Sequence, residues 1–446
     1  MADETPLIRR ARTLQPLSDH RRERARPASM REIIGVRWNK SRLERSSAKT
    51  PEPPMARPKV RLREGDVEAF RNVAHSVISR TLARECEYRR QGCPEPDVQE
   101  WKLVKRHKGL RVYKCKMQPA FQPSLSQENA LARAPTAICI GTIDGSLQDV
   151  LYGLHTKTRR EMHVTNTFMN KDHLECAVLS VIEHGSDRDP FKQLALKWIL
   201  AQNFGDMKCG NYHDVCSIES TGTGVDGGGQ RFGYRLIKSV DLAEYPQLST
   251  SNDVVRVRMT MCWIFRQEAN SRTVRVYSKG MLDMGQKIPS FGPNSDATCT
   301  MMLSIASATE IAEAKRLTLL ALQRAEYDAC LSQRTCEAED SCRETEATVT
   351  SPLPAQGSFD PRESFLQKMP SDPCSVCGKK PAMSKFVRAS HRSCGVCKQP
   401  VCHKCHVKRR LVARSVALVV ACCKICIIAS KRLRVDPRDP CPMLTV

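Results

Sequence analysis

Eight cysteines near the C-terminal end of this 446-residue chain form four Cys-x2-Cys pairs, and no other feature restricts the fold of the chain as strongly. The pairs begin at Cys374, Cys394, Cys402 and Cys423 and are separated by 16, 4 and 17 residues. Each pair can present two thiolates to one metal ion from a tight turn, and zinc takes four such ligands in a tetrahedron. The spacing therefore predicts two zinc ions.

The gap of four residues is too short for the second and third pairs to share an ion comfortably, so we expect the pairs to alternate. A register that uses Cys422 in place of Cys423 stays open. A disulfide knot is the alternative, but disulfides belong to oxidising compartments and the N-terminus does not resemble a secretion signal. The first zinc would be held by Cys374, Cys377, Cys402 and Cys405, and the second by Cys394, Cys397, Cys423 and Cys426.

The formal net charge of +23 is concentrated at the two ends of the chain. Residues 374–435 contain 15 Lys and Arg and no Asp or Glu, and residues 1–60 contain 15 against 7. The residues between these segments are close to neutral. A zinc-binding segment such as 374–435, with many cations and no acid, attracts an anionic membrane, an inositol phosphate or a nucleic acid. The basic residues can also form a merely solvated surface.

Three segments lack the periodicity of a packed domain. Residues 1–60 are rich in Arg, Pro and Ser and are expected to be disordered, with a nuclear signal or an anion-binding arm as functional alternatives. Residues 331–373 are expected to be a flexible linker, and 431–446 a tail. Residues 411–428 are the most apolar stretch, but Arg414 and Lys424 interrupt it, so a strand leading into the second zinc site is favoured over a transmembrane helix.

Residues 61–330 alternate between helical and strand periodicity. The clearest strand is 255–265, where Val255, Val257, Met259, Met261, Trp263 and Phe265 share one face and Arg256, Arg258 and Thr260 share a face expected to be solvent-exposed. Gly222–Gln230 has the glycines of a phosphate loop but lacks its Lys-Ser/Thr, so a hairpin turn is expected. One helix is expected from Asp66, as N-cap, to about Arg84, and another from a Ser307–Glu310 capping box to about Cys330. Two shorter helices are expected over 146–154 and 158–168. Further strands are expected over 110–115, 136–142, 176–182, 194–200, 232–236 and 273–281.

This order predicts an α+β, helix-grip architecture, in which an antiparallel sheet curls around a long C-terminal helix. In size, element order and the Trp101–Val104 and Leu110–Tyr113 opening, residues 61–330 resemble a START-type lipid-binding domain. The resemblance implies a hydrophobic cavity for one lipid or sterol, and no catalysis. The candidates to line it are Met259, Met261, Trp263 and Phe265, which can alternatively just fill a core.

The cysteine region, 374–430, resembles a FYVE-type zinc finger in the order of its pairs, the four-residue gap and the final Cys-x2-Cys. That family uses a cross-brace and often binds phosphatidylinositol 3-phosphate. Its basic block R-(R/K)-H-H-C-R reads Ser390–Gly395 here, so the double His is absent and Gly395 stands where the family has Arg. The resemblance implies headgroup contacts from Arg388, His391 and Arg392 and membrane insertion of Phe386 and Val387.

Together these resemblances, a pairing familiar from oomycete proteins, predict a non-enzymatic, peripheral lipid-binding adaptor. It would be cytoplasmic, on endosomal or other intracellular membranes, with anionic lipids such as phosphoinositides as partners and two zinc ions as cofactors. The sequence offers no recognisable Ser–His–Asp set or carboxylate pair for catalysis. Two alternatives stay open: a finger that binds protein or nucleic acid, and a RING-type finger that recruits a ubiquitin-conjugating partner.

Overall fold

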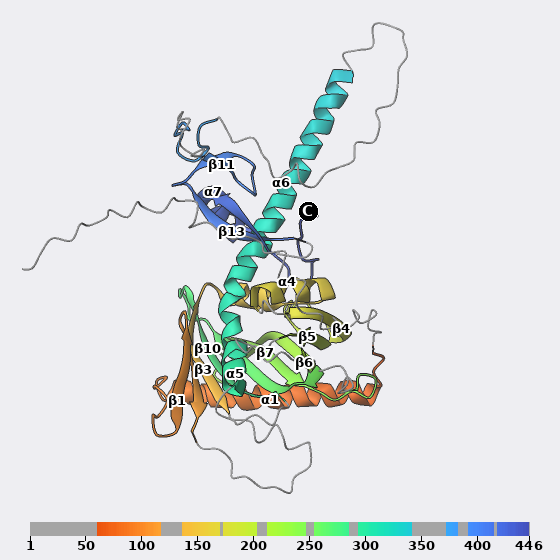
Figure 1. Ribbon diagram of the computed structural model, residues 1–446, viewed down its shortest axis with the longest axis vertical. Coiled ribbons are helices and arrows are strands. Elements are labelled where there is room, and N and C mark those ends of the chain that lie inside the picture. The colour runs from red at the N-terminus through yellow and green to blue at the C-terminus, as the bar shows by residue number, and fades with distance from the viewer. Residues whose placement is uncertain are drawn as a thin grey trace, which may run out of the picture. The chain divides into compact units, whose positions relative to one another are not determined.

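The computed structural model describes residues 60–116, 136–169, 173–202, 212–246, 254–284, 293–340, 372–381, 391–413 and 417–445 (Figure 1). By its contacts, Met55–Val446 forms one compact unit, distinct from Met1–Pro54. The predicted disordered region 1–60 lies outside the described residues except for Val60, which is buried and donates its N–H to the Leu179 carbonyl.

The described part of the larger unit contains a ten-stranded sheet in the order β1-β2-β3-β10-β9-β7-β6-β5-β4, with β8 beside β6. Every pair in it is antiparallel except β6 with β8. Two meanders meet where β10 pairs with β3, so the first and last thirds of the domain adjoin. The strands are β1 Trp101–His107, β2 Leu110–Cys115, β3 Ala137–Asp144, β4 His173–Glu183, β5 Gln193–Ala201, β6 Tyr212–Val225, β7 Arg231–Ser239, β8 Val254–Arg256, β9 Arg258–Arg266 and β10 Thr273–Asp283.

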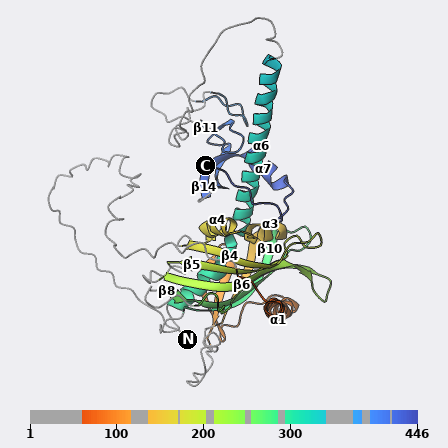
Figure 2. The ribbon, with the colours of Figure 1, turned by 90° about the vertical axis from the view of Figure 1, so that its right-hand side faces the viewer.

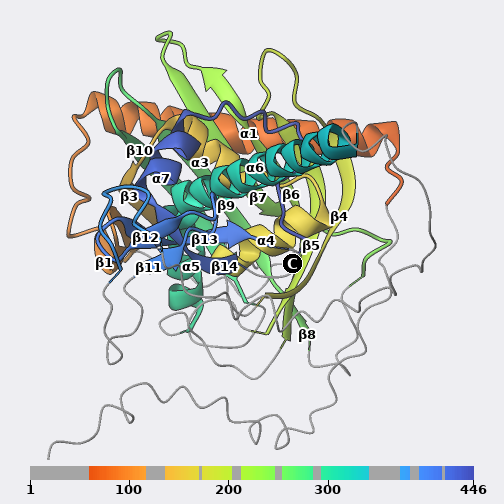
Figure 3. The same ribbon diagram turned by 90° about the horizontal axis from the view of Figure 1, so that it is seen from above.

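Helices cover both faces of this sheet (Figure 2). One face carries α1, Glu64–Arg90. The other carries α3 (Leu147–Leu154), α4 (Arg159–Met169), α5 (Pro293–Leu303), the 3-10 turn η4 (Ser304–Ser307) and the beginning of α6 (Ala308–Asp340). Figure 3, seen from above, shows α6 running alongside α3. The predicted α+β helix-grip architecture with a long C-terminal helix is confirmed.

The sheet separates two apolar layers. On β9, Met259 and Trp263 belong to the layer under α3 and α5, whereas Cys262 and Ile264 belong to the layer under α1. The predicted solvent-exposed face was therefore wrong for Arg256, which is buried, and holds in part for Arg258 and Thr260, which are partly exposed; α1 covers this face further along β9, at Cys262 and Ile264. The predicted strand 255–265 also divides at Val257 into β8 and β9.

Arg256, on β8, is buried by contacts of its own. Its guanidinium donates two hydrogen bonds to Asp214, with Nε–Oδ1 2.8 Å and Nη2–Oδ2 2.9 Å. The Trp198 indole N–H donates to the same carboxylate at 3.0 Å. A buried charge of this kind is tolerated only when it is paired and hydrogen-bonded.

Four element boundaries differ from the sequence predictions. The helix α1 begins at Glu64, and Asp66 is its third residue, whose carboxylate accepts the Arg63 N–H. The predicted capping box at Ser307 does not start a helix, because Ser307 lies in η4 and the chain enters α6 already helical. Gly222 lies within β6 and not in a turn. The helix α6 also continues to Asp340, so the first ten residues of the predicted linker 331–373 are helical, while 341–371 lie outside the described residues.

The cysteine-rich region forms two small hairpins and a helix that pack on α6. Its elements are β11 His391–Ser393, β12 Pro400–Cys402, β13 His406–Val412, β14 Ala417–Cys423 and α7 Lys424–Arg432. Arg410 donates two hydrogen bonds to Glu310, and the Val412 N–H donates to the Thr318 hydroxyl at 2.8 Å. The described part of the apolar stretch 411–428 thus contains the end of β13, then β14 and the beginning of α7. None of the described helices has the length and apolar character needed to cross a bilayer.

The C-terminal tail, predicted over 431–446, packs back on the domain. The Leu444 N–H donates to the Val412 carbonyl at 2.9 Å, and the Lys157 ammonium donates to the Arg438 carbonyl at 2.6 Å. Arg438 also forms an ion pair with Asp187. The tail thereby joins the finger to the segments before α4 and between β4 and β5.

Candidate functional site

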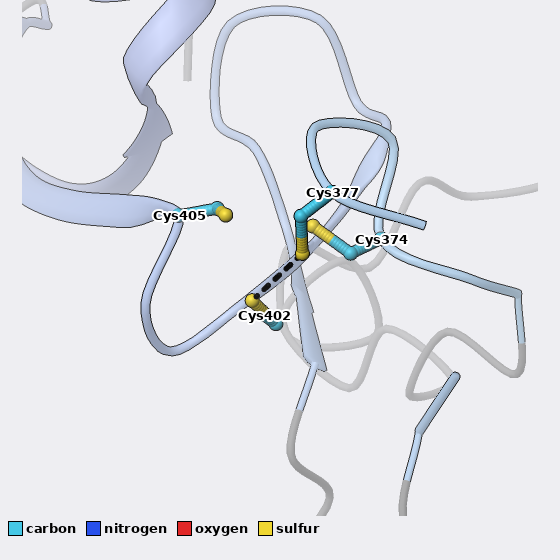
Figure 4. Close-up of side chains that lie close together, drawn as sticks. All are labelled: Cys374, Cys377, Cys402 and Cys405. Carbon is cyan, nitrogen blue, oxygen red and sulfur yellow. Dashed lines mark hydrogen bonds between the residues drawn. The ribbon is translucent and has the colours of Figure 1, made fainter. Parts of the chain in front are cut away.

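The eight paired cysteines gather into two groups of four. Within each group the four sulfur atoms lie within 4.8 Å of one another. Figure 4 shows the first group, in which two short turns bring the four side chains together. The groups are Cys374, Cys377, Cys402 and Cys405, and Cys394, Cys397, Cys423 and Cys426, the same alternation of pairs as the spacing predicts.

The distances between sulfurs fit a metal tetrahedron. A zinc–sulfur bond of about 2.3 Å gives a tetrahedron whose sulfur–sulfur edges are about 3.8 Å. Cys377 Sγ lies 3.7 Å from Cys402 Sγ, and Cys397 Sγ lies 3.9 Å from Cys423 Sγ. A disulfide would bring two sulfurs to about 2.05 Å. Four thiolates at this spacing suit zinc, and both groups can hold a metal ion.

Local backbone geometry holds the thiols in place. The turn after Cys374 closes with a Gly378 N–H to Cys374 carbonyl bond of 2.8 Å, and the turn after Cys394 closes with a Lys398 N–H bond of 2.9 Å. Gly378 and Lys398 both adopt left-handed backbone angles, φ +69° and +59°, which such tight turns require. The Cys423 N–H also donates to Cys394 Sγ at 3.3 Å, as expected for a thiolate acceptor.

Of the residues predicted to bind a lipid headgroup, the structure describes two, and only one of them is exposed. His391 is fully buried, and its Nε2 lies 2.7 Å from the Lys379 carbonyl oxygen, so it ties two segments of the finger together and cannot reach a headgroup. Strand β11 pairs with β12, which turns His391 inward and leaves Arg392 exposed. Arg388 and the predicted insertion residues Phe386 and Val387 lie outside the described residues.

The backbone at Gly395, where the FYVE-type pattern has an arginine, is closely packed. A Cβ on Gly395 would lie 2.6 Å from Val420 Cγ2, well inside contact distance. The Gly395 N–H donates to the Ala421 carbonyl at 2.8 Å, so β14 lies directly against this position. A long cationic side chain does not fit between these segments.

A second candidate site is a cavity of about 60 Å³ between the sheet and the helices α4 and α5. Of the four residues predicted to line it, Met259 and Trp263 do so, while Met261 and Phe265 are buried in the adjoining core. The volume admits a few water molecules but no lipid. The remaining lining residues are Asn166, Met169, Lys197, Ile199, Val215, Ser217, Glu219, Arg235, Ile237, Thr300, Met301 and Ser304.

Three buried charged side chains line this cavity, each from a different strand. Glu219 on β6 accepts hydrogen bonds from Lys197 Nζ on β5 at 3.0 Å and from Arg235 Nε on β7 at 2.9 Å. Lys197 also donates to the Thr156 hydroxyl at 2.8 Å. We call Lys197, Glu219 and Arg235 the charge triad. It contains two cations and one anion.

The neighbours of the triad shift its ionisation. Burial by itself would raise the pKa of Glu219, but the adjacent Arg235 and Lys197 charges outweigh it and hold that pKa at about 2. Burial lowers the pKa of Lys197, and Glu219 opposes this shift. The carboxylate therefore stays ionised at neutral pH.

Arg235, which lines the cavity, retains unused hydrogen-bonding capacity. It is 8% exposed, and its Nε is its hydrogen-bond donor to Glu219. Its two Nη groups have no hydrogen-bond partner among the described residues, and the guanidinium carbon lies 5.8 Å from the centre of the Trp263 ring. A buried guanidinium with an open edge is suited to an oxygen-rich group on a ligand.

Sequence periodicity did not single out the triad, although one signal for it exists. Lys197 interrupts an otherwise apolar strand, Leu194–Ala201, at a position facing α4. A lysine on the buried face of a strand needs an anionic partner. The partner could not be chosen, because Glu219 is 22 residues away in sequence and meets Lys197 only through the β5–β6 register.

The helix α4 contacts both candidate sites. Asn166 and Met169 line the cavity. Phe168 belongs to an apolar cluster with Val412, and the Arg410 guanidinium lies 4.0 Å from the centre of the Phe168 ring. The metal-holding region and the cavity therefore adjoin the same eleven-residue helix.

His155, which follows α3, predicts a measurable pH dependence. Its pKa is lowered from 6.5 to about 3, mainly by burial and then by the Lys315 and Lys197 charges. The unfolded chain binds the imidazole proton below pH 6.5 and the folded chain does not, so stability is full above 6.5 and falls as the pH drops. Between pH 7 and 5.5 this group should cost about 1.3 kcal/mol. Urea unfolding at both pH values measures how much unfolding free energy the protein loses between pH 7 and pH 5.5. This loss should be smaller in His155→Gln than in the wild type by about 1.3 kcal/mol. An equal loss in the two proteins would contradict a neutral, buried His155.

Comparisons with known proteins identify no family for this chain. No family model and no curated protein matches it. Among solved structures, human STARD10 is similar at 15% identity and a TM-score of 0.32, covering 57% of this chain and 82% of that one. Human StAR-related lipid transfer protein 5 is similar at 13% identity and a TM-score of 0.35, covering 55% of this chain and 98% of that one. A STAR-related lipid transfer protein fragment from Xanthomonas axonopodis is similar at 15% identity and a TM-score of 0.30, covering 47% of this chain and 98% of that one. Likenesses at this level assign neither ligand nor activity.

Proposed function

We propose that this chain binds a hydrophobic ligand with an oxygen-bearing head group, performs no catalysis, and uses a zinc-stabilised finger to associate with anionic membranes. The observation that carries the ligand-binding part is the open edge of Arg235, which lines a cavity that combines apolar side chains such as Met259, Trp263 and Ile237 with several polar ones. Ligand cavities combine mostly apolar walls with a few placed polar groups of this kind.

Ligand entry requires the cavity to widen from about 60 Å³. Three of its lining residues, Met169, Met259 and Met301, are methionines. Methionine side chains adapt to varied shapes because they are unbranched and have three rotatable bonds. Met169 and Met301 lie on the helices α4 and α5, so a shift of these helices away from the sheet would enlarge the space.

Zinc is the metal we assign to both cysteine groups, because eight thiolates with sulfur–sulfur distances of 3.7 and 3.9 Å match its preferred ligands and geometry. Its contribution is structural. Four thiolates complete each site, which leaves no open position for a substrate. The ions would fix β14 and α7 relative to β11 and β12.

Membrane association is supported by the charge of the finger. Residues 374–435 contain no acid, so every formal side-chain charge there, apart from the metal-bound thiolates, is positive. Because His391 is buried and Gly395 replaces an arginine, we propose a general preference for anionic lipids and not a specific pocket for phosphatidylinositol 3-phosphate. Attachment to endosomal or other intracellular membranes follows as part of the same proposal.

A binding experiment with the full-length chain tests the cavity. The probe is a fluorescent fatty-acid analogue, which is apolar with an anionic head, and a fluorescent sterol analogue serves as a second, uncharged probe. We expect Arg235→Gln to weaken binding of the fatty-acid analogue by at least about tenfold, since a hydrogen bond to a charged group contributes about 1.5–3 kcal/mol. Sterol binding should change less.

Arg258→Gln is the matched control, because Arg258 pairs with Asp241 at the surface and does not line the cavity. It should bind the fatty-acid analogue as the wild type does. Unchanged affinity in a folded Arg235→Gln variant, or a wild type that binds neither probe, would contradict the proposed ligand site.

A further inference from the structure

The helix α7 presents a face that no other described element covers. Its buried residues are Cys426, Ile427 and Ser430. Ile427 packs in one apolar cluster with Leu317 and Ala321 of α6. Among its outward-facing residues are two isoleucines, Ile425 and Ile428, which are 52% and 56% exposed.

Helical geometry places the exposed residues on a single stripe. At 3.6 residues per turn, each residue advances about 100° around the axis. Ile428 then lies at the centre of an arc of about 120°, and the buried residues lie on the opposite side. The members of this stripe, which we call the α7 face, are Lys424, Ile425, Ile428, Lys431 and Arg432, all of them exposed.

The charge of the α7 face is entirely positive. Lys424, Lys431 and Arg432 flank the two isoleucines, and residues 374–435 hold no acid to neutralise them. The acids of α6 nearest to the finger are already engaged, because Glu310 is paired with Arg410 and Glu313 with Arg409. Lys431, by contrast, has no ion-pair partner among the described residues.

The second cysteine group anchors the start of this face. Cys423 caps the N-terminus of α7, where its sulfur accepts the Cys426 N–H at 3.3 Å, and Cys426 lies in the first turn. Both belong to the second cysteine group. A helix of nine residues is too short to be stable in isolation, so its shape depends on this anchor and on α6.

We propose that the α7 face is the surface by which the finger docks on an anionic lipid bilayer, with Ile425 and Ile428 entering the interfacial region and Lys424, Lys431 and Arg432 contacting lipid phosphates. Exposed apolar side chains ringed by cations are what an anionic bilayer surface selects. This rests on the proposed membrane role of the finger, and it moves the contact from the predicted loop at Phe386 and Val387 to the helix.

Vesicle sedimentation with the full-length, zinc-loaded chain tests the proposal. The vesicles are phosphatidylcholine alone or phosphatidylcholine mixed with phosphatidylserine. We expect the wild type to bind only the mixed vesicles, and both Ile425→Ser/Ile428→Ser and Lys431→Gln/Arg432→Gln to bind them at least about tenfold more weakly. Metal content measured on each variant verifies that the finger is intact.

Matched controls come from the sheet domain. Val98→Ser/Val225→Ser removes two apolar side chains that are 72% and 63% exposed, and Lys102→Gln/Arg106→Gln removes two exposed cations. Both should bind like the wild type. If the two α7 variants bind like the wild type while Phe386→Ser/Val387→Ser does not, the docking surface is the loop and this inference is wrong. If the wild type does not bind mixed vesicles, the inference and the membrane part of the proposed function both fail, whereas ligand binding in the cavity is unaffected.

Discussion

Replacing Glu219 by glutamine should lower the free energy of unfolding by about 3–5 kcal/mol, because it leaves two adjacent buried cations without a counter-charge. Lys197 and Arg235 are 1% and 8% exposed, so bulk water screens them poorly, and a water molecule in the cavity brings no counter-charge. Chemical denaturation at pH 7 measures the change. The expected loss is large relative to the total stability of a typical domain.

Glu68→Gln is the control for this prediction. Its carboxylate pairs with Arg71 on the surface of α1, where the two side chains are 60% and 45% exposed. Exposed pairs contribute only about 0–1 kcal/mol. A Glu219→Gln variant no less stable than Glu68→Gln would show that Lys197 is neutral in the folded chain, and the charge triad would not exist as described.

Two adjacent cysteines give the second large effect. Cys423→Ala should abolish binding of one of the two metal ions and unfold part of the finger, because structural zinc contributes about 10–16 kcal/mol of apparent binding free energy in isolated fingers. Cys422→Ala should retain both ions, since Cys422 is fully buried but belongs to neither cysteine group. Metal content per folded chain is the measurement.

Comparing the Cys422 and Cys423 variants also decides which of the two cysteines binds the second metal ion. If Cys422→Ala loses an ion and Cys423→Ala does not, the second site uses a Cys-x3-Cys pair, and the position of α7 relative to the metal changes. The sulfur of Cys423, 3.9 Å from Cys397 Sγ, supports the assignment made here.

The metal groups could be predicted from sequence because their information is local. A Cys-x2-Cys pair specifies its own turn, and the four-residue gap between Cys397 and Cys402 limits how pairs combine. Strands were found for a related reason, since alternation of apolar residues reports burial within one segment. The cysteine spacing and the apolar alternation can both be read from the sequence without knowledge of the tertiary fold.

The charge triad and the second face of β9 could not be predicted, because both depend on contacts between distant segments. Whether Cys262 and Ile264 face water is decided by α1, which begins at Glu64 and covers this side of the sheet. Glu219 meets Arg235 only once β6 and β7 pair in register. The burial of His391 likewise follows from the pairing of β11 with β12 and from the Lys379 carbonyl, not from its neighbours in sequence.

Native mass spectrometry of the full-length chain, purified without chelator, measures bound metal and bound ligand in one experiment. We expect a folded chain that carries two zinc ions and, in a fraction of molecules, one non-covalently bound apolar molecule that Arg235→Gln releases. A chain that is folded and free of metal, and from which no apolar molecule can be recovered, would contradict this expectation.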